Sequence, residues 1–183
     1  MNVFDLKTYY QKKVVPELQK TLNIKNMLAL PRLAKVVVNI GVGRMREEKQ
    51  IEEVIRYLKL ITGQQPHARP TKKAIASFKT RQGMIVGYRV TLRGVRMYDF
   101  LSRLIHIALP RMRDFKGIPS GSVDEGGNLT IGFPEYIVFP EMIGEDYRFL
   151  SGFQVTIVTT AFSKKEALML FRELGFPFQH AEE

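Results

Sequence analysis

The spacing of hydrophobic positions along the chain predicts three helices before its last third. Between residues 3 and 22 an apolar residue recurs at every fourth position, which predicts an amphipathic helix that Pro16 kinks or restarts. A second apolar stripe covers residues 47–61, and the most regular stripe runs from Met97 to Ala108. Pro110 is expected to end this third helix.

A fourth helix is predicted near the C-terminus. It begins at Ser163, because Glu166 follows three residues later and completes a capping box. Gly175 occupies the position where a left-handed residue commonly ends a helix. The expected apolar stripe consists of Ala167, Leu168, Phe171 and Leu174.

Four segments rich in β-branched and aromatic residues predict strands, namely residues 35–40, 85–93, 129–133 and 154–160. Residues 63–83 mix prolines, basic residues and isolated apolar residues without a sustained period. We expect a long loop with short pieces of strand there. A long ordered loop inside a compact domain is uncommon and is often functional.

Four helices and four strands in this order predict an α+β fold, with a largely antiparallel sheet and helices packed on one face as a two-layer sandwich. We expect one domain that spans residues 1–183. Alternation along the strands places four polar side chains on one sheet face, Asn39, Arg89, Thr91 and Arg93. Amide, hydroxyl and guanidinium groups on a rigid sheet suit contacts to RNA, although an ordinary solvated sheet face fits the alternation equally well.

The charge of the chain changes this picture, because the net charge of +10 comes from one segment. Residues 54–98 contain ten Lys or Arg residues and no Asp or Glu, whereas the remainder has 18 residues of each sign. Such a segment attracts a polyanion by neutralising phosphates and releasing their counterions. A basic surface kept for solubility would tolerate interspersed acids, and an anionic membrane ranks third because no helix pairs a basic face with exposed aromatics.

Catalytic and metal-binding patterns are missing from the sequence. The chain has no cysteine, and its histidines, His67, His106 and His180, are too far apart to suggest a metal site. No serine stands in the strand–turn–helix context of a nucleophile. We therefore predict no catalytic residue, no metal and no cofactor; an enzyme that acts on RNA would need carboxylates or a metal near the basic segment. The chain also lacks a signal-peptide pattern and a long apolar run, so we expect a cytoplasmic protein without a membrane partner.

Six short stretches along nearly the whole chain are distinctive in their order and spacing. They are residues 31–39 (Pro-Arg-Leu-Ala-Lys-Val-Val-Val-Asn), 61–66 (Ile-Thr-Gly-Gln-Gln-Pro), 78–83 (Phe-Lys-Thr-Arg-Gln-Gly), 90–94 (Val-Thr-Leu-Arg-Gly), 110–117 (Pro-Arg-Met-Arg-Asp-Phe-Lys-Gly) and 175–178 (Gly-Phe-Pro-Phe). Together they resemble the universal large-subunit ribosomal protein L5 family, of the bacterial type.

This resemblance implies a structural constituent of the large ribosomal subunit. It implies binding of 5S ribosomal RNA (rRNA) in the central protuberance, with 23S rRNA, neighbouring ribosomal proteins and a protein of the small-subunit head as further partners. The family's RNA-recognising residues fall on Asn39, Gln64, Thr91 and Arg93, and Arg89 lies on the same predicted face. Strand alternation independently places three of the four on that face.

The resemblance also implies a mobile basic loop, at about residues 70–84, that contacts the transfer RNA (tRNA) in the peptidyl (P) site. Its expected phosphate contacts are Lys72, Lys73, Lys79 and Arg81. The sequence departs from the family's usual pattern at residues 122–129 and 133–136, which bear on the small-subunit bridge, and at Pro70. The alternative to 5S-specific binding is a general nucleic-acid chaperone, which would bind duplex DNA and unrelated RNA equally well.

Overall fold

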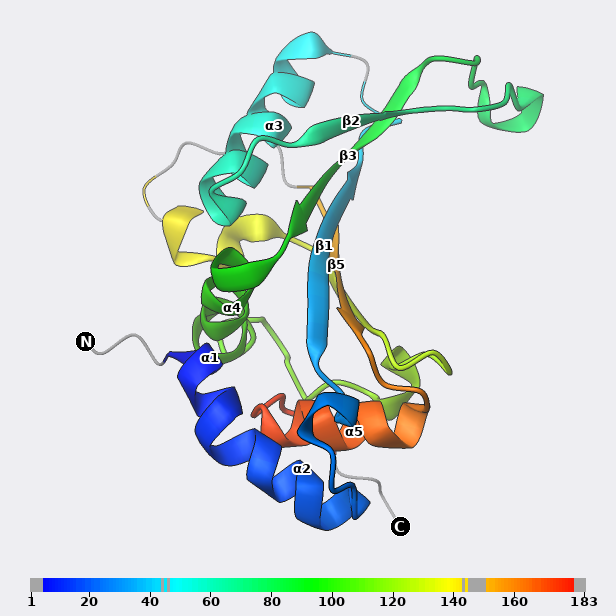
Figure 1. The fold of residues 1–183 in the computed structure, drawn as a ribbon. Helices are drawn as coiled ribbons and strands as arrows, with labels where there is room; N and C mark the ends of the chain where they lie inside the picture. Colours follow the sequence, from blue (N-terminus) through cyan, green and yellow to red (C-terminus); the bar gives the residue numbers. More distant parts are fainter. Residues whose placement is uncertain (1–4, 44, 46, 143, 145–150, 180–183) are drawn as a thin grey trace. The chain divides into compact units, whose positions relative to one another are not determined.

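The α+β fold is present in the computed structural model, which describes residues 5–43, 45, 47–142, 144 and 151–179. Five strands form one sheet in the order β2-β3-β1-β5-β4, where β2 pairs antiparallel with β3 (Figure 1). The sheet is largely antiparallel and has helices on one face, as expected. The strands are β1 (Leu33–Gly41), β2 (His67–Pro70), β3 (Ile85–Leu92), β4 (Leu129–Phe133) and β5 (Phe153–Thr159).

The described helices comprise α1 (Leu6–Tyr9), α2 (Val15–Leu22), α3 (Glu48–Thr62), α4 (Gly94–Arg103) and α5 (Lys164–Glu173), with short 3₁₀ and π turns between them. Contacts divide the chain into two compact units. Unit 1 comprises Met1–Val36, Leu92–Ile131 and Thr156–Glu183, and unit 2 comprises Val37–Thr91 and Gly132–Val155. Among the described residues no helix is both long and apolar enough to span a membrane.

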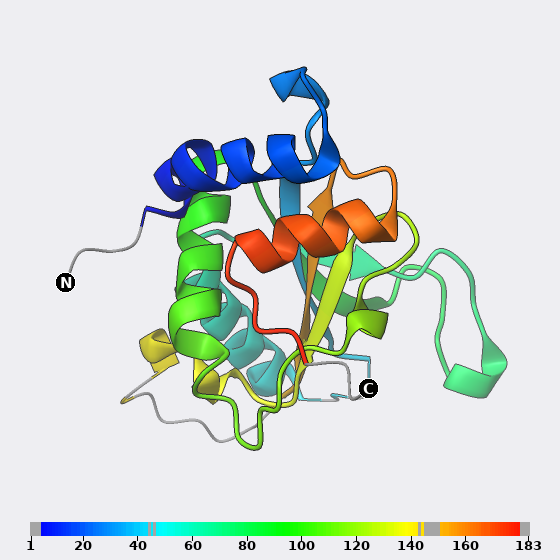
Figure 2. The same cartoon turned by 90° about the horizontal axis from the view of Figure 1, so that it is seen from below.

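In unit 1 the N-terminal helix is interrupted just before Pro16. The turn Tyr10–Val14 is a π-helix, and α2 restarts at Val15 with the proline in its first turn. Proline has no N–H to donate and is tolerated in the first turn of a helix, so the restart is the expected response. In Figure 2, α1 lies beside α4 and α2 lies beside α5, in agreement with the contacts between these pairs.

Both ends of α5 lie where the sequence predicts, although the Glu166 carboxylate accepts from the Phe162 N–H and not from the Ser163 N–H of a full capping box. The Ser163 hydroxyl accepts a hydrogen bond from the Glu166 N–H at 3.3 Å. At the other end Gly175 has φ +88°, and the Phe176 N–H donates to the Phe171 carbonyl at 3.0 Å, which is the bond of a Schellman motif. The two phenylalanine rings meet edge to face at 5.3 Å, which supplies the hydrophobic contact typical of that motif.

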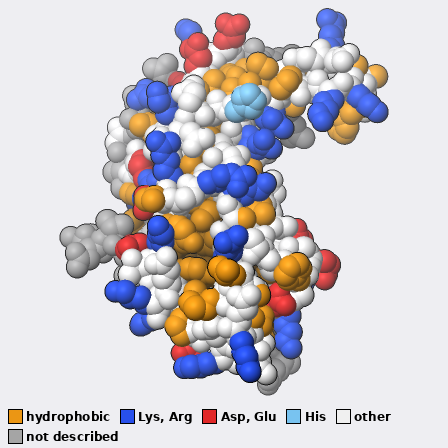
Figure 3. Space-filling model, in the orientation of Figure 1, with side chains coloured by type: hydrophobic (Ala, Val, Ile, Leu, Met, Phe, Trp, Pro, Cys, Tyr) orange, Lys and Arg blue, Asp and Glu red, His pale blue; other side chains and the backbone are white. Residues whose placement is uncertain are grey.

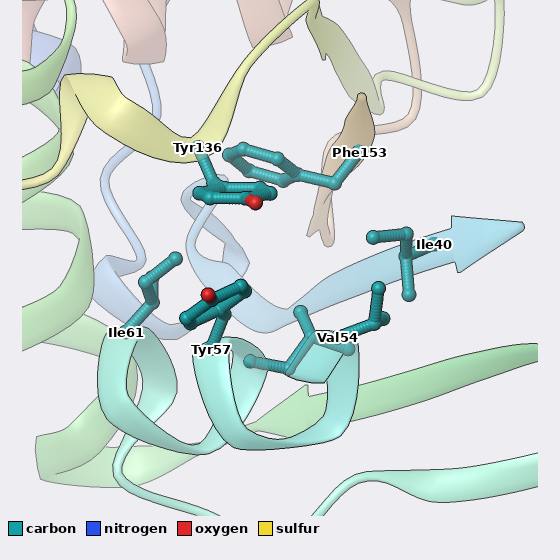
Figure 4. A pocket seen from close by; sticks show the side chains of 7 residues that line it. Ile40, Val54, Tyr57, Ile61, Tyr136 and Phe153 are labelled. Atoms are coloured by element: carbon teal, nitrogen blue, oxygen red, sulfur yellow. The ribbon is translucent and has the colours of Figure 1, made fainter. Parts of the chain in front are cut away.

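In unit 2, α3 packs its buried side against strand β1 and the segment after β4. Figure 4 shows the contact, where Val54, Tyr57 and Ile61 of α3 face Ile40 and Tyr136 around an apolar cavity of about 10 Å³. The rings of Tyr57 and Tyr136 are 4.8 Å apart. Phe133, Phe139 and Phe153 complete this core.

Candidate nucleic-acid interface

The polar face of β1 and β3 in unit 2, defined by Asn39, Arg89 and Thr91, follows the predicted alternation. Val38 and Ile40 are buried on either side of the exposed Asn39. On β3, Val90 is buried, whereas Arg89 and Thr91 on either side of it are half-buried. Because α3 covers the opposite side of this part of the sheet, the three polar side chains remain on the uncovered side.

Gln64 is attached to β3 by a hydrogen bond to the strand's backbone. Its side-chain amide donates a hydrogen bond to the Thr91 carbonyl at 3.3 Å. Strand β2 ends its pairing at His67, opposite Arg89, and Pro66 before it has no N–H to donate. The Gln64 side chain thus donates a hydrogen bond to a β3 carbonyl that has no partner residue in β2.

The backbone at Gln64 is itself held by the end of α3. Gly63 has φ +65°, so the chain turns sharply after the helix. The hydroxyl of the buried Thr62 donates to the Leu58 carbonyl at 2.6 Å and accepts from the Gln64 N–H at 3.4 Å. These bonds hold the backbone of Gln64 in place, from which its side-chain amide reaches the Thr91 carbonyl.

Arg93 lies two residues after Thr91 along the chain and belongs to unit 1. Its backbone is extended, with φ −141° and ψ 163°, and it occupies the N-cap position of α4. The side chain is exposed and makes no capping hydrogen bond. Its guanidinium is therefore not used to cap this helix.

A glycine lets β3 approach β1 closely near the end of β1. A Cβ atom at Gly87 would lie 2.7 Å from the Ile40 carbonyl oxygen, which is shorter than any normal contact. At the neighbouring Gly41, a Cβ atom would meet nothing within 4 Å. Only glycine at residue 87 permits this strand spacing.

The basic loop between β2 and β3 forms a hydrogen-bonded extension of that hairpin. The Thr71 N–H donates to the Met84 carbonyl at 2.9 Å, and the Gly83 N–H donates to the Thr71 carbonyl at 3.0 Å. Further out, Ile75 and Thr80 form an antiparallel bridge across a 3₁₀ turn at Ala76–Phe78. Lys79 takes a left-handed conformation, with φ +52°, to close the turn.

The side chains of the basic loop point into solvent. Lys72, Lys73, Lys79 and Arg81 are all exposed. In Figure 3 the hairpin extension at the upper right shows Lys and Arg side chains with hydrophobic side chains among them, and the acidic side chains visible near the top lie to its left. The charge of the loop is therefore available to a polyanion.

The structure adds apolar side chains that sequence reasoning left without a role. Phe78 is 75% exposed, and Ile75, Met84 and Ile85 are between 39% and 47% exposed. In the sequence these four residues look like isolated apolar positions in a loop, with no indication that they are exposed. The position of Phe78 beside Lys79 and close to Arg81 was the available signal, because an aromatic among cations is a common arrangement for stacking on bases.

Two family models match the chain. The model of the C-terminus of the ribosomal L5 family matches residues 85–178, and the model of ribosomal protein L5 matches residues 26–81. The chain belongs to the ribosomal protein L5 family. Large ribosomal subunit protein uL5 of Malacoplasma penetrans is 46% identical over 175 residues, which cover 95% of this chain and 94% of that protein.

Two further L5-family relatives are similar over a comparable length. Large ribosomal subunit protein uL5 of Mycoplasma pneumoniae is 46% identical over 174 residues, or 94% of this chain and 97% of that protein. The uL5 protein of Symbiobacterium thermophilum is 45% identical over 95% of this chain and 97% of its own length. Membership of the L5 family makes the chain a structural, non-enzymatic constituent of the large ribosomal subunit, active in translation on the cytoplasmic ribosome.

Proposed function

We propose that the chain binds 5S rRNA through the polar face of β1 and β3, together with Gln64 and Arg93. The observation that carries this proposal is the Gln64–Thr91 hydrogen bond, since it joins two of the proposed contacts into one fixed arrangement. Amide and hydroxyl groups held at fixed positions can pair with 2′-hydroxyl groups and base edges. The guanidinium groups of Arg89 and Arg93 supply phosphate contacts.

The basic loop then serves a second RNA, the tRNA in the P site. Its four cations are exposed at the end of a hairpin and are suited to positioning a phosphate backbone without reading its sequence. The exposed ring of Phe78 gives the loop a surface on which a base can stack. We expect the loop to become less mobile when tRNA or rRNA binds.

Membership of the family supports further partners in the large subunit. We propose that 23S rRNA, neighbouring proteins of the central protuberance and a protein of the small-subunit head contact other surfaces of the chain. The whole chain is proposed to act as one ribosomal-protein domain in these contacts, although it contains two compact units.

A binding titration tests the main proposal. Purified protein is titrated with bacterial 5S rRNA at several salt concentrations, with tRNA and duplex DNA as competitors. A preference for 5S rRNA that survives rising salt is expected, because shape-specific contacts lose less affinity with salt than phosphate contacts alone. Equal binding to all three nucleic acids would instead support the general nucleic-acid chaperone.

A matched pair of variants tests whether the preference for 5S rRNA depends on the polar face and Gln64. Gln64→Ala removes the hydrogen bond to Thr91 and is expected to weaken 5S rRNA binding about tenfold. Gln65→Ala removes an exposed amide of the same size one residue away and should leave the affinity unchanged. Equal effects of the two substitutions would remove Gln64 from the proposed site.

A further inference from the structure

Helix α5 of unit 1 has a second apolar side that its own fold leaves uncovered. Its buried residues are Ala167, Leu170 and Phe171. Leu168, which the sequence placed on the core stripe, is only half-buried, as is Met169 beside it. These two side chains lie in an open groove of about 530 Å³, whose other lining residues are Glu125, Ser163, Lys164, Lys165 and Arg172.

Cations stand at both ends of this apolar strip. Lys164, Leu168 and Arg172 follow one another at intervals of four, so they form one row along the helix. Lys165 precedes Met169 by the same interval. The one acid that lines the groove, Glu125, has its carboxylate 3.8 Å from the Lys164 ammonium, and its side chain is 92% exposed. The groove is therefore positively charged around an apolar floor.

An exposed aromatic residue directly precedes Ser163, the first residue of the groove lining on this side of α5. Phe162 is 87% exposed, although its N–H donates to the Glu166 carboxylate at 3.1 Å. In many helices an apolar residue at this position packs on the fifth residue after it, but here that residue is Ala167, which is buried in the core. The backbone of Phe162 is thus held in place while its ring has no intramolecular cover.

We infer that this groove docks an acidic amphipathic segment of another protein, with its apolar side chains on Leu168, Met169 and Phe162. Carboxylates of that segment would meet Lys164, Lys165 and Arg172 at the ends of the strip. An apolar floor favours a protein side chain over a phosphate backbone, and the Glu125 carboxylate, 3.8 Å from the Lys164 ammonium, leaves Lys165 and Arg172 as the cations most available to the segment. None of these residues belongs to the proposed RNA contacts, so the inference goes beyond the proposed function.

Three synthetic probes test whether the groove prefers an acidic segment to a basic one, and a peptide to RNA. The probe is a synthetic helical peptide of about four turns, with Leu at one face and Glu elsewhere. A companion peptide carries Lys in place of each Glu, and a short single-stranded RNA provides the third probe. Fluorescence anisotropy with the full-length protein should show saturable binding of the acidic peptide and at least tenfold weaker binding of the companion peptide. The RNA can bind the basic loop, so it is added as a competitor and should not displace the acidic peptide.

Variants of the groove then localise the binding. Reversing the three cations (Lys164→Glu, Lys165→Glu and Arg172→Glu together) should weaken the acidic peptide at least tenfold. A control with the same charge change on exposed lysines of unit 1 (Lys12→Glu, Lys20→Glu and Lys25→Glu) should retain most of the affinity. Phe162→Ser changes a ring that touches little of the protein, and is expected to lower the affinity several-fold without affecting the melting temperature.

Three results would overturn the inference. They are no binding of the acidic peptide to the wild-type protein, equal loss in the groove and control variants, and RNA binding that depends on the three groove cations. Binding of 5S rRNA is measured in parallel on every variant. Because the groove residues are not among the proposed 5S contacts, a failure of this inference with intact 5S binding leaves the proposed function standing.

Discussion

The polar face of β1 and β3 and the basic loop both offer groups suited to RNA, but their side chains are held very differently. On the polar face, Thr91 is half-buried and its carbonyl is bonded by Gln64, whose own backbone is fixed by Thr62. In the basic loop the hydrogen bonds are made by the backbone and by the Thr71 and Thr80 hydroxyls, whereas the lysine side chains extend into solvent.

This difference predicts two kinds of recognition. Groups at fixed positions lose little conformational entropy on binding and discriminate between shapes. Long cationic side chains on a hairpin bind through charge, with affinity that falls steeply as salt rises. Substitutions test this difference between the two surfaces. They are made first in the sheet itself, then in each surface, and last at a site that belongs to neither surface.

The largest effect is expected from Gly87→Ala. The added methyl group would meet the Ile40 carbonyl oxygen at 2.7 Å, so β3 must move away from β1. We expect a loss of about 3 kcal/mol in the free energy of unfolding, measured by urea denaturation, and a matching loss of 5S rRNA affinity. Gly41→Ala in the same sheet meets no atom within 4 Å and serves as the control. Equal stability of the two variants would contradict this account of the sheet.

Arg93→Ala tests a single guanidinium two residues along the chain from Thr91. Its side chain is exposed and does not cap α4, so the fold should be unchanged by circular dichroism and thermal melting. Affinity for 5S rRNA should fall about tenfold, the usual effect of losing a hydrogen bond from a charged group. Arg96→Ala, an exposed arginine in the first turn of the same helix, should change it little. Unchanged 5S affinity in Arg93→Ala would remove this residue from the site.

The double substitution Lys72→Ala and Lys73→Ala tests the basic loop. The affinity for tRNA should fall several-fold. In a plot of the logarithm of the tRNA binding constant against the logarithm of salt concentration, the slope should become less steep by about two. Binding of 5S rRNA should remain. The control, Lys12→Ala with Lys25→Ala, removes two exposed lysines from unit 1. Parallel losses of tRNA and 5S binding in the loop variant would mean that the two surfaces do not have separate roles.

The smallest effect is expected at Asp124, which belongs to neither surface. The Asn128 side-chain amide and backbone N–H both donate to this carboxylate, and they hold its pKa below the ordinary value of 3.8. Because the folded-state pKa is the lower one, the stabilisation is present above the unfolded-state value and is lost as pH falls through the folded-state value. Asp124→Ala should therefore lower the melting temperature slightly at pH 6 and converge with the wild type near pH 2. Both RNA affinities should be unaffected.

Local patterns were sufficient for most elements of the fold. The cap at Ser163, the left-handed Gly175 and the restart at Pro16 depend only on neighbouring residues, because they concern hydrogen bonds within one or two turns. The burial alternation around Asn39 and Thr91 was likewise predicted from the period of a strand. Net charge and its concentration between residues 54 and 98 already pointed to a polyanionic partner.

Features that depend on packing partners were beyond the sequence pattern. On α5 the expected stripe included Leu168, but Leu170 is the buried residue. Residues 167–171 form an unbroken apolar run, whose pattern does not say which side of the helix faces the core. Tyr57 was not expected in the core, and it is buried against Tyr136, nearly 80 positions later in the chain. The short strand β2 was expected only as strand pieces within a loop, since its pairing is supplied by β3.

The sequence by itself determined the class of the fold, the basic segment and three of the polar residues on the sheet. Only the tertiary structure decided the strand order, the bond from Gln64 to the Thr91 carbonyl and the uncovered side of α5. The physical reason is the range of the interactions. Periodicity, caps and charge density are properties of a few neighbouring residues, whereas register and burial are set by residues that are distant along the chain and meet only when the core forms.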